Sequence, residues 1–169
     1  KSVALLTEDR RATGILGVLS VADNISIASL DALRKGPIML DNKKILDLVA
    51  TNKEKMAIKV PSPKTQIKSL SGGNQQKVVI AKWIGMHPSI IIMDEPTRGI
   101  DVGAKRDIYD LMNELTAQGV AIIMVSSDLP EVIGMSDRIL VVHEGKIAGE
   151  IPHDQATQEN IITLATGGI

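Results

Sequence analysis

Three runs of apolar residues without polar alternation mark the strands that this chain is expected to form. They are Ser2–Leu6, Ser89–Met93 and Val120–Val125. Runs of this kind are typical of parallel strands that are covered on both faces. Two further segments, Arg138–His143 and Lys146–Ile151, predict an antiparallel hairpin near the carboxyl end.

Helical periodicity fills the intervals between these strands. The clearest case is Ala104–Gln118, where apolar residues recur at helical spacing and Gly119 ends the pattern. Further helices are expected over Asn74–Met86, from Pro130 onward and over Thr157–Ala165. Strands that alternate with helices predict an α/β fold with a mostly parallel sheet.

The stretch between residues 20 and 70 has a different pattern. Asp41 is placed to cap a helix whose apolar residues share one face, while Gly36-Pro37 and Val60–Pro63 interrupt the helical pattern. We therefore expect a mainly helical subdomain over residues 20–70. Residues 71–169 are expected to carry the carboxyl ends of the strands, where chemistry gathers in sheets of this type.

The composition fits a globular domain and excludes several kinds of site. The 169 residues include 19 Lys and Arg against 20 Asp and Glu, a formal charge of −1 that disfavours a nucleic-acid binder. There are no cysteines, which excludes disulfides, thiolate zinc sites and a cysteine nucleophile. The apolar runs are far shorter than the roughly 18 residues that span a bilayer. The three histidines lack metal-site spacing, and aromatic residues, at 1%, are too few to favour stacking on a free sugar.

The string Ser71-Gly72-Gly73 stands at the start of a predicted helix. Glycine lets a backbone approach a ligand closely, and the first amides of a helix have no partner within it. With the positive end of the helix dipole and the Ser71 hydroxyl, these amides form a potential anion site. A plain loop-to-helix junction with Ser71 as its N-cap is the alternative interpretation.

Acidic and hydroxyl residues follow two of the predicted strands. Asp94-Glu95 comes after the second strand, and Ser126-Ser127-Asp128 comes after the third. One carboxylate could hold Mg²⁺ through water while the other takes a proton from an attacking water. The acidic pair alone also fits a solvated turn, but its continuation through Pro96-Thr97 and Gly99-Ile100-Asp101 is far more specific.

In these segments the sequence resembles the ATP-binding cassette (ABC) ATPases, a family with a P-loop NTPase-like fold. The resemblance covers nearly the whole chain. Its parts are the signature motif (Leu70–Gln76), the Walker B strand with its catalytic glutamate (Ile90–Glu95), the D-loop (Gly99–Asp101), the opening of the helical subdomain (Ser20–Ile25) and the closing hairpin (Arg138–Ile147). The resemblance implies ATP and Mg²⁺ as cofactors, and ATPase activity in the complete protein.

Three segments resemble more narrowly the carboxyl-terminal half of fused ATPases that serve monosaccharide importers of the ribose and galactose type. They are Asn74–Lys77, Asp94–Lys105 and Ser126–Glu131. By this resemblance, ATP hydrolysis energises import of a monosaccharide across the cytoplasmic membrane. The implied partners are an amino-terminal ATPase half, integral membrane permease subunits that contact residues 20–70 and, indirectly, a sugar-binding protein. The implied location is cytoplasmic, peripheral on the inner face of the membrane.

Three departures from the family pattern bear on activity. No Gly-x-x-x-x-Gly-Lys-[Ser/Thr] string occurs, so the Walker A loop is missing, and we expect a chain truncated at its amino end. Ser127 stands where the family has its switch histidine and cannot supply an imidazole. Glu8 stands where the family has its Q-loop glutamine, although it also fits a solvated residue in a charged loop. The isolated chain is therefore expected to be inactive.

In the resembled family, two halves pair head to tail, and the signature motif of one covers the ATP held by the other. The implied nucleotide-binding residues are Ser71, Gly72, Gly73, Asn74, Gln75, Asp101 and Glu8. Asp94 is expected to hold Mg²⁺ through water, Glu95 to act as the general base and Ser127 to occupy the switch position. The alternative is a degenerate, non-hydrolysing half that completes the partner's ATP site and docks on the permease. The Asp94–Lys105 string disfavours a non-transport relative.

Overall fold

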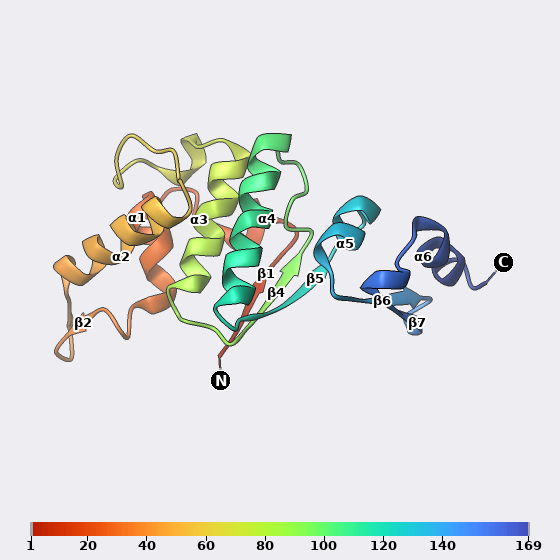
Figure 1. The fold of residues 1–169 in the computed structure, drawn as a ribbon. Helices are drawn as coiled ribbons and strands as arrows, with labels where there is room; N and C mark the ends of the chain where they lie inside the picture. Colours follow the sequence, from red (N-terminus) through yellow and green to blue (C-terminus); the bar gives the residue numbers. More distant parts are fainter. Residues whose placement is uncertain (1, 169) are drawn as a thin grey trace. The chain divides into compact units, whose positions relative to one another are not determined.

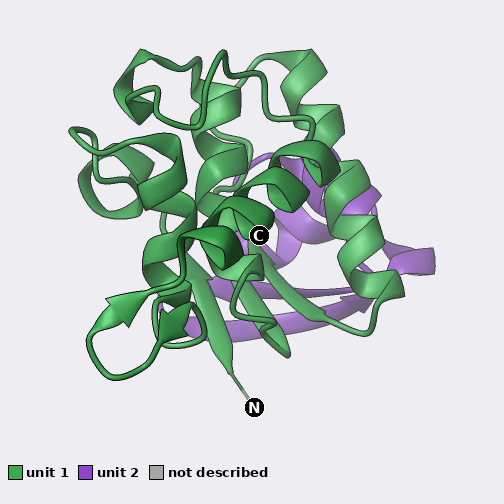
Figure 2. Ribbon diagram, turned by 90° about the vertical axis from the view of Figure 1, so that its left-hand side faces the viewer, with its two compact units in different colours: residues 1–125 green, residues 126–169 purple. Residues whose placement is uncertain are grey.

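The computed structural model describes residues 2–168, and the chain divides into two compact units, residues 1–125 and residues 126–169 (Figure 2). The sequence predicts one domain with a helical subdomain over residues 20–70, and the structure divides between Val125 and Ser126. The helical segment expected over residues 20–70 lies within the first unit, because its first helix packs against the helix that begins at Gly72.

The first unit is built on a three-stranded parallel sheet with the order β1-β4-β5 (Figure 1). Its strands are β1 (Val3–Leu6), β4 (Ile90–Asp94) and β5 (Ala121–Val125). All three continuous apolar runs are therefore confirmed as strands, and the expected α/β class with a parallel sheet is confirmed with them.

Two helices cover one face of this sheet, as Figure 1 shows. They are α3 (Gly72–Ile84) and α4 (Val102–Ala117). The strand residues beneath them are fully buried and include Ala4, Leu6, Ile91 and Met93. Exposed apolar residues lie on the alternate positions of the outer strands, namely Val3, Leu5, Ile123 and Val125. The core of this unit is thus aliphatic and lies between the sheet and the two helices.

The segment between β1 and α3 contains short helices and one small hairpin. Its elements are η1 (Arg10–Gly14), α1 (Val21–Ser26), η2 (Ile27–Ser29), β2 (Arg34–Lys35), β3 (Met39–Leu40), α2 (Asn42–Lys55) and η3 (Ile67–Ser69). Asp41 caps α2 as predicted, since its carboxylate accepts from the amides of Lys43 and Lys44. The β2–β3 hairpin was not predicted, because Gly36-Pro37 was interpreted as a helix breaker and each strand is only two residues long.

The second unit is an antiparallel hairpin that packs against helices. Its elements are α5 (Leu129–Met135), β6 (Arg138–His143), β7 (Lys146–Pro152), η4 (His153–Gln155) and α6 (Gln158–Ala165). The predicted hairpin and closing helix are confirmed. Its core is aliphatic and consists of Ile139, Val141, Ile151 and Ile161.

Two absences concern the residues that the structure describes. Within residues 2–168, no helix is long and apolar enough to cross a membrane. The same residues contain no group of three His, Asp or Glu side chains arranged to hold a metal ion. His143 and His153 instead place Nδ1 2.7 Å from the Ala165 carbonyl and 2.9 Å from the Ser136 carbonyl, respectively.

Candidate functional site

The signature turn, Ser71-Gly72-Gly73, opens helix α3. Ser71 is the N-cap, and its Oγ accepts from the amide of Asn74 at 3.4 Å and from the Asn74 side chain at 2.9 Å. The Asn74 Oδ1 in turn accepts from the amide of Lys59 at 2.8 Å. This chain of hydrogen bonds fixes the Ser71 hydroxyl at an exposed position on the positive end of the helix.

Close approach requires glycine at position 73, whereas at position 72 the neighbouring atom is the end of a flexible arginine side chain. A Cβ at Gly73 would lie 2.5 Å from the Cβ of Ala104 in α4, and a Cβ at Gly72 would lie 2.7 Å from Nη2 of Arg10. Real Cβ atoms do not approach other heavy atoms so closely. The turn therefore sits directly against α4 on one side and against a guanidinium group on the other.

The turn opens into a cavity of about 400 Å³ between the amino ends of α3 and α4. Its lining residues are Lys59, Ser71, Gly73, Asn74, Lys77, Asp101, Gly103, Ala104 and Asp107. Asp101 is the N-cap of α4 and accepts from the amide of Ala104 at 3.0 Å. Four residues expected to bind nucleotide, Ser71, Gly73, Asn74 and Asp101, thus line one cavity.

Two lysines in this cavity were not predicted from the sequence. Lys77 donates from Nζ to Asp107 Oδ2 at 2.7 Å, and its side chain is only 5% exposed. Its position four residues after Gly73 places it on the same face of α3, a spacing that could have revealed it. Lys59 comes from the segment before α3, and no local pattern connects it to the turn.

Gln75 lies away from the cavity that holds its neighbours. Its side chain is buried, and its Nε2 donates to the carbonyls of Ile67 and Leu70 at 3.3 and 3.2 Å. These bonds tie the segment before the signature turn to the first turn of α3.

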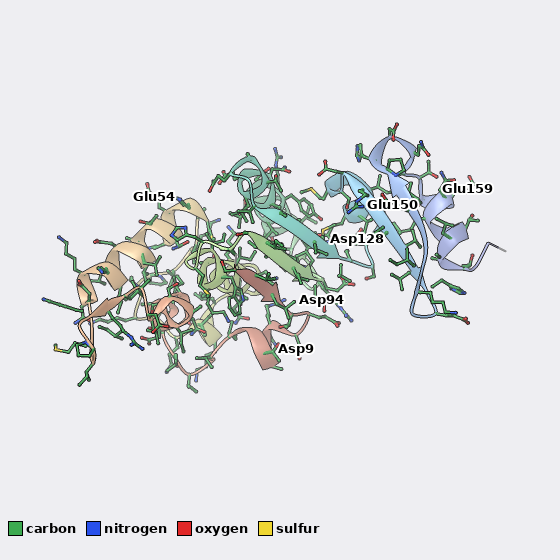
Figure 3. The ribbon with its side chains drawn as sticks, turned by 90° about the horizontal axis from the view of Figure 1, so that it is seen from below. Asp9, Glu54, Asp94, Asp128, Glu150 and Glu159 are labelled. Carbon is green, nitrogen blue, oxygen red and sulfur yellow. The ribbon has the colours of Figure 1, made fainter. Side chains whose placement is uncertain are left out.

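The acidic pair lies at the carboxyl end of β4, where Figure 3 labels Asp94. Both carboxylate residues are half-buried. Glu95 has a positive φ of 47°, a conformation that side chains other than glycine adopt at a cost of about 1–3 kcal/mol. Its amide donates to the Val125 carbonyl at 2.8 Å, which ties the turn to β5. Strained turns of this kind cluster at functional sites.

The two predicted residues Glu8 and Ser127 do not line the cavity. Glu8 forms an ion pair with Arg98 in the loop after β4, and half or more of each side chain is exposed. Ser127 belongs to the second unit, in a turn where Ser126 donates to Glu131 at 2.5 Å and the amide of Asp128 donates to Ser126 at 3.1 Å.

Comparisons with known proteins show the family to which the chain belongs. The model of a family described as ABC transporter matches residues 3–98. The ribose import ATP-binding protein of Bacillus subtilis (strain 168) is 57% identical over 169 residues, which are 99% of this chain and 34% of that protein. The xylose import ATP-binding protein of Thermoanaerobacter pseudethanolicus is 53% identical over 166 residues, 98% of this chain and 33% of that protein.

Solved structures share the fold at much lower identity. The dimeric post-hydrolysis structure of the ATP-binding cassette MJ0796 bound to ADP and Pi superposes with a TM-score of 0.76 at 19% identity. That match covers 90% of this chain and 63% of the other. The chain spans about a third of the length of the curated relatives that it matches.

Proposed function

We propose, because the chain belongs to the ABC transporter family of ATPases, that it forms part of an ATP-binding and hydrolysing subunit that energises import of a monosaccharide. The relatives named for ribose and xylose import support a pentose or similar monosaccharide as the cargo. The observation that carries the proposal is the cavity at the signature turn, which is lined by the start of α3 and its capping hydroxyl, by Lys59 and Lys77, and by Asp101 and Asp107. The Lys77 ammonium is paired with Asp107, so the donors that remain for an anion are the helix-start amides and the Ser71 hydroxyl.

The signature turn acts as a clamp on the γ-phosphate of ATP that a second ATPase half holds. In this role the Ser71 hydroxyl and the free amides of the turn donate to phosphate oxygens. Preorganised donors stabilise developing charge without reorganising during the reaction. Asn74 and the Lys59 amide keep the hydroxyl in place. Asp101 caps α4 on the opposite wall of the same cavity.

Asp94 and Glu95 are assigned to a second nucleotide, bound with Mg²⁺ on this half. A carboxylate at a strand end fits Mg²⁺, which keeps several waters and binds through one or two carboxylates and the substrate phosphates. Asp94 would hold the metal through water, and Glu95 would accept a proton from the attacking water. When bound, Mg²⁺ supplies charge neutralisation to the phosphates. Ser127, at the switch position, offers a hydroxyl but no imidazole.

The partners follow from this assignment. We infer a second, amino-terminal ATPase half, integral membrane permease subunits contacted through residues 20–70 and, indirectly, a sugar-binding protein. The assembly would lie on the cytoplasmic face of the membrane. We refer to this chain together with the second half and the permease as the assembled ATPase.

A second candidate function is a non-hydrolysing half that completes the ATP site of its partner and docks on the permease. The pairing of Glu8 with Arg98 and the serine at position 127 favour it, because neither residue matches the family pattern at the strand-end site. Both candidates retain the signature clamp, so they differ only in the role of Glu95.

Uptake into vesicles tests the main proposal. The assembled ATPase, placed in lipid vesicles with the sugar-binding protein, is supplied with ATP and a panel of radiolabelled monosaccharides. The proposal predicts ATP-dependent uptake of at least one pentose or hexose, with phosphate release stimulated by that sugar. Phosphate release that never responds to the permease or to any sugar would contradict it. The isolated chain should release no phosphate.

A further inference from the structure

Arg10 lies where three segments of the first unit meet. It belongs to η1, the turn that follows β1, and its Nη1 donates to the Arg98 carbonyl at 3.2 Å. Its Nη2 occupies the space that a Cβ at Gly72 would need, and the same space is bordered by the Gly99 carbonyl at 3.4 Å. The guanidinium group therefore fills the gap between the signature turn and the loop after β4.

The Arg10 side chain is partly buried. Burial is the main factor that lowers its pKa, and the charge of Arg11 acts in the same direction, while Asp9 opposes them. The Nε atom is buried and has no hydrogen-bond partner. A buried polar atom without a partner destabilises a fold. The guanidinium group is therefore held here by its bond to the Arg98 carbonyl and its place beside Gly72, while its Nε makes no bond.

Other contacts hold η1 along helix α3. Lys82 donates from Nζ to the Gly14 carbonyl at 2.6 Å, and a Cβ at Gly14 would lie 3.4 Å from Val79. Arg10 thus contacts the first residue of α3, while Gly14 is held two to three turns further along the helix. The loop after β1 is therefore braced against the whole signature helix.

We infer that Arg10 is a positioning residue that holds the signature turn in register with the loop after β4. This inference rests on the proposed function, because it assigns Arg10 a role in placing the clamp on the γ-phosphate. Arg10 does not line the cavity, so it acts through Gly72 rather than on the nucleotide. A clamp displaced by about 1 Å loses much of its effect on the rate.

The first test compares two neighbouring arginines in the assembled ATPase. Arg10→Ala is expected to lower kcat for ATP by about tenfold with little change in KM, since the clamp engages as the site closes. Arg11→Ala is the matched control, because Arg11 is exposed and next in sequence, and it should leave kcat unchanged. Arg10→Lys keeps one donor for the Arg98 carbonyl and should give an intermediate kcat. It also serves as the test variant if Arg10→Ala fails to assemble.

The second test uses the close approach at Gly72. Gly72→Ala introduces a methyl group that competes with Arg10 for space, so it should lower kcat in the wild-type background and cost little more when Arg10 is already alanine. Gly73→Ala meets Ala104 instead, so its cost should be the same with or without Arg10. The inference therefore predicts that the effects of Gly72→Ala and Arg10→Ala on kcat are coupled, while those of Gly73→Ala and Arg10→Ala are additive. A general loss of stability would not produce this difference.

The outcomes separate the inference from the proposed function. If Ser71→Arg abolishes turnover while Arg10→Ala matches Arg11→Ala, the clamp stands and the role of Arg10 is overturned. Additive effects of Arg10→Ala and Gly72→Ala overturn it as well. If the wild-type assembly has no turnover, or Ser71→Arg retains full turnover, the proposed clamp fails and the inference fails with it.

Discussion

The signature turn and the end of β4 both lie in the first unit, but different contacts hold them in place. At the turn, Ser71, Asn74 and the Lys59 amide form one chain of hydrogen bonds, and the two glycines are packed against Arg10 and Ala104. All of these contacts lie within residues 1–125. At the end of β4, the Glu95 amide donates to the Val125 carbonyl at 2.8 Å, and Glu95 keeps a strained positive φ of 47°.

This difference separates two tasks that an ATPase half performs. A clamp needs fixed donors, and rigid local packing supplies them. Hydrolysis also needs a base, a metal ligand and a group at the switch position, and the serine at position 127 supplies no imidazole. We therefore expect substitutions at the signature turn to lower turnover more than substitutions at the end of β4.

Ser71→Arg is expected to have the largest effect, a loss of about 100- to 1000-fold in ATP turnover. The variant removes the capping hydroxyl and places a long side chain in the cavity. Steady-state phosphate release by the assembled ATPase measures the effect. Ser71→Thr retains a hydroxyl that can cap the helix and should keep most of the activity. Equal losses in both variants would point to disruption of the helix start instead of the clamp.

Gly73→Ala is expected to have the next largest effect. The new Cβ overlaps Ala104, so α3 and α4 must separate, at a cost of about 1–3 kcal/mol in stability. Thermal unfolding of the assembly and phosphate release should both report the loss. Ala104→Gly removes the obstructing methyl group, so the double variant should recover part of both quantities. Failure of this suppression would show that the packing seen here does not limit activity.

Glu95→Gln is expected to lower turnover by less than about tenfold, compared with about 100- to 10,000-fold for loss of an essential general base. Gln has nearly the same shape as Glu, so the variant can adopt the same backbone conformation at position 95. The same phosphate-release assay, run beside Ser71→Arg, gives the ratio of the two effects. A loss as large as that of Ser71→Arg would contradict the comparison, and no loss at all would favour the non-hydrolysing half.

Ser127→His should have the smallest effect, a change in turnover of no more than about twofold. The substitution restores an imidazole at the switch position, but it acts at the site that contributes less to turnover. A pH profile of phosphate release is the suitable readout, because an imidazole titrates near neutral pH. A large gain in rate, with a new dependence on pH between about 6 and 8, would show that this serine alone limits the half.

Local periodicity in the sequence predicted most of the regular structure. The strands and the helices α3, α4 and α6 lie within a few residues of their predicted bounds, because burial imposes a period on strands and helices alike. The β2–β3 hairpin escaped prediction because it is short, exposed and carries no alternating pattern. The division between Val125 and Ser126 depends on packing between distant segments, which no local pattern encodes.

The sequence singled out four residues of the cavity through two separate motifs. Ser71, Gly73 and Asn74 come from the signature string and Asp101 from the D-loop string, and the structure brings the two strings together. Gln75, although in the same motif, directs its amide to the Ile67 and Leu70 carbonyls. Arg10 and Lys59 reach the turn from other segments, and tertiary packing alone brings them there.

Protection of a thiol at the signature turn tests the central claim most directly. The chain has no cysteine, so Ser71→Cys supplies its single thiol, and Gln118→Cys at the exposed end of α4, made as a separate variant, supplies a control thiol. The rate of alkylation at each position is followed by mass spectrometry of the corresponding peptide. The account predicts that ATP and the second ATPase half together slow alkylation of the thiol at position 71 but not of the thiol at position 118, and that neither does so alone. Unchanged alkylation at position 71 in the complete mixture, or protection by ATP without the second half, would contradict it.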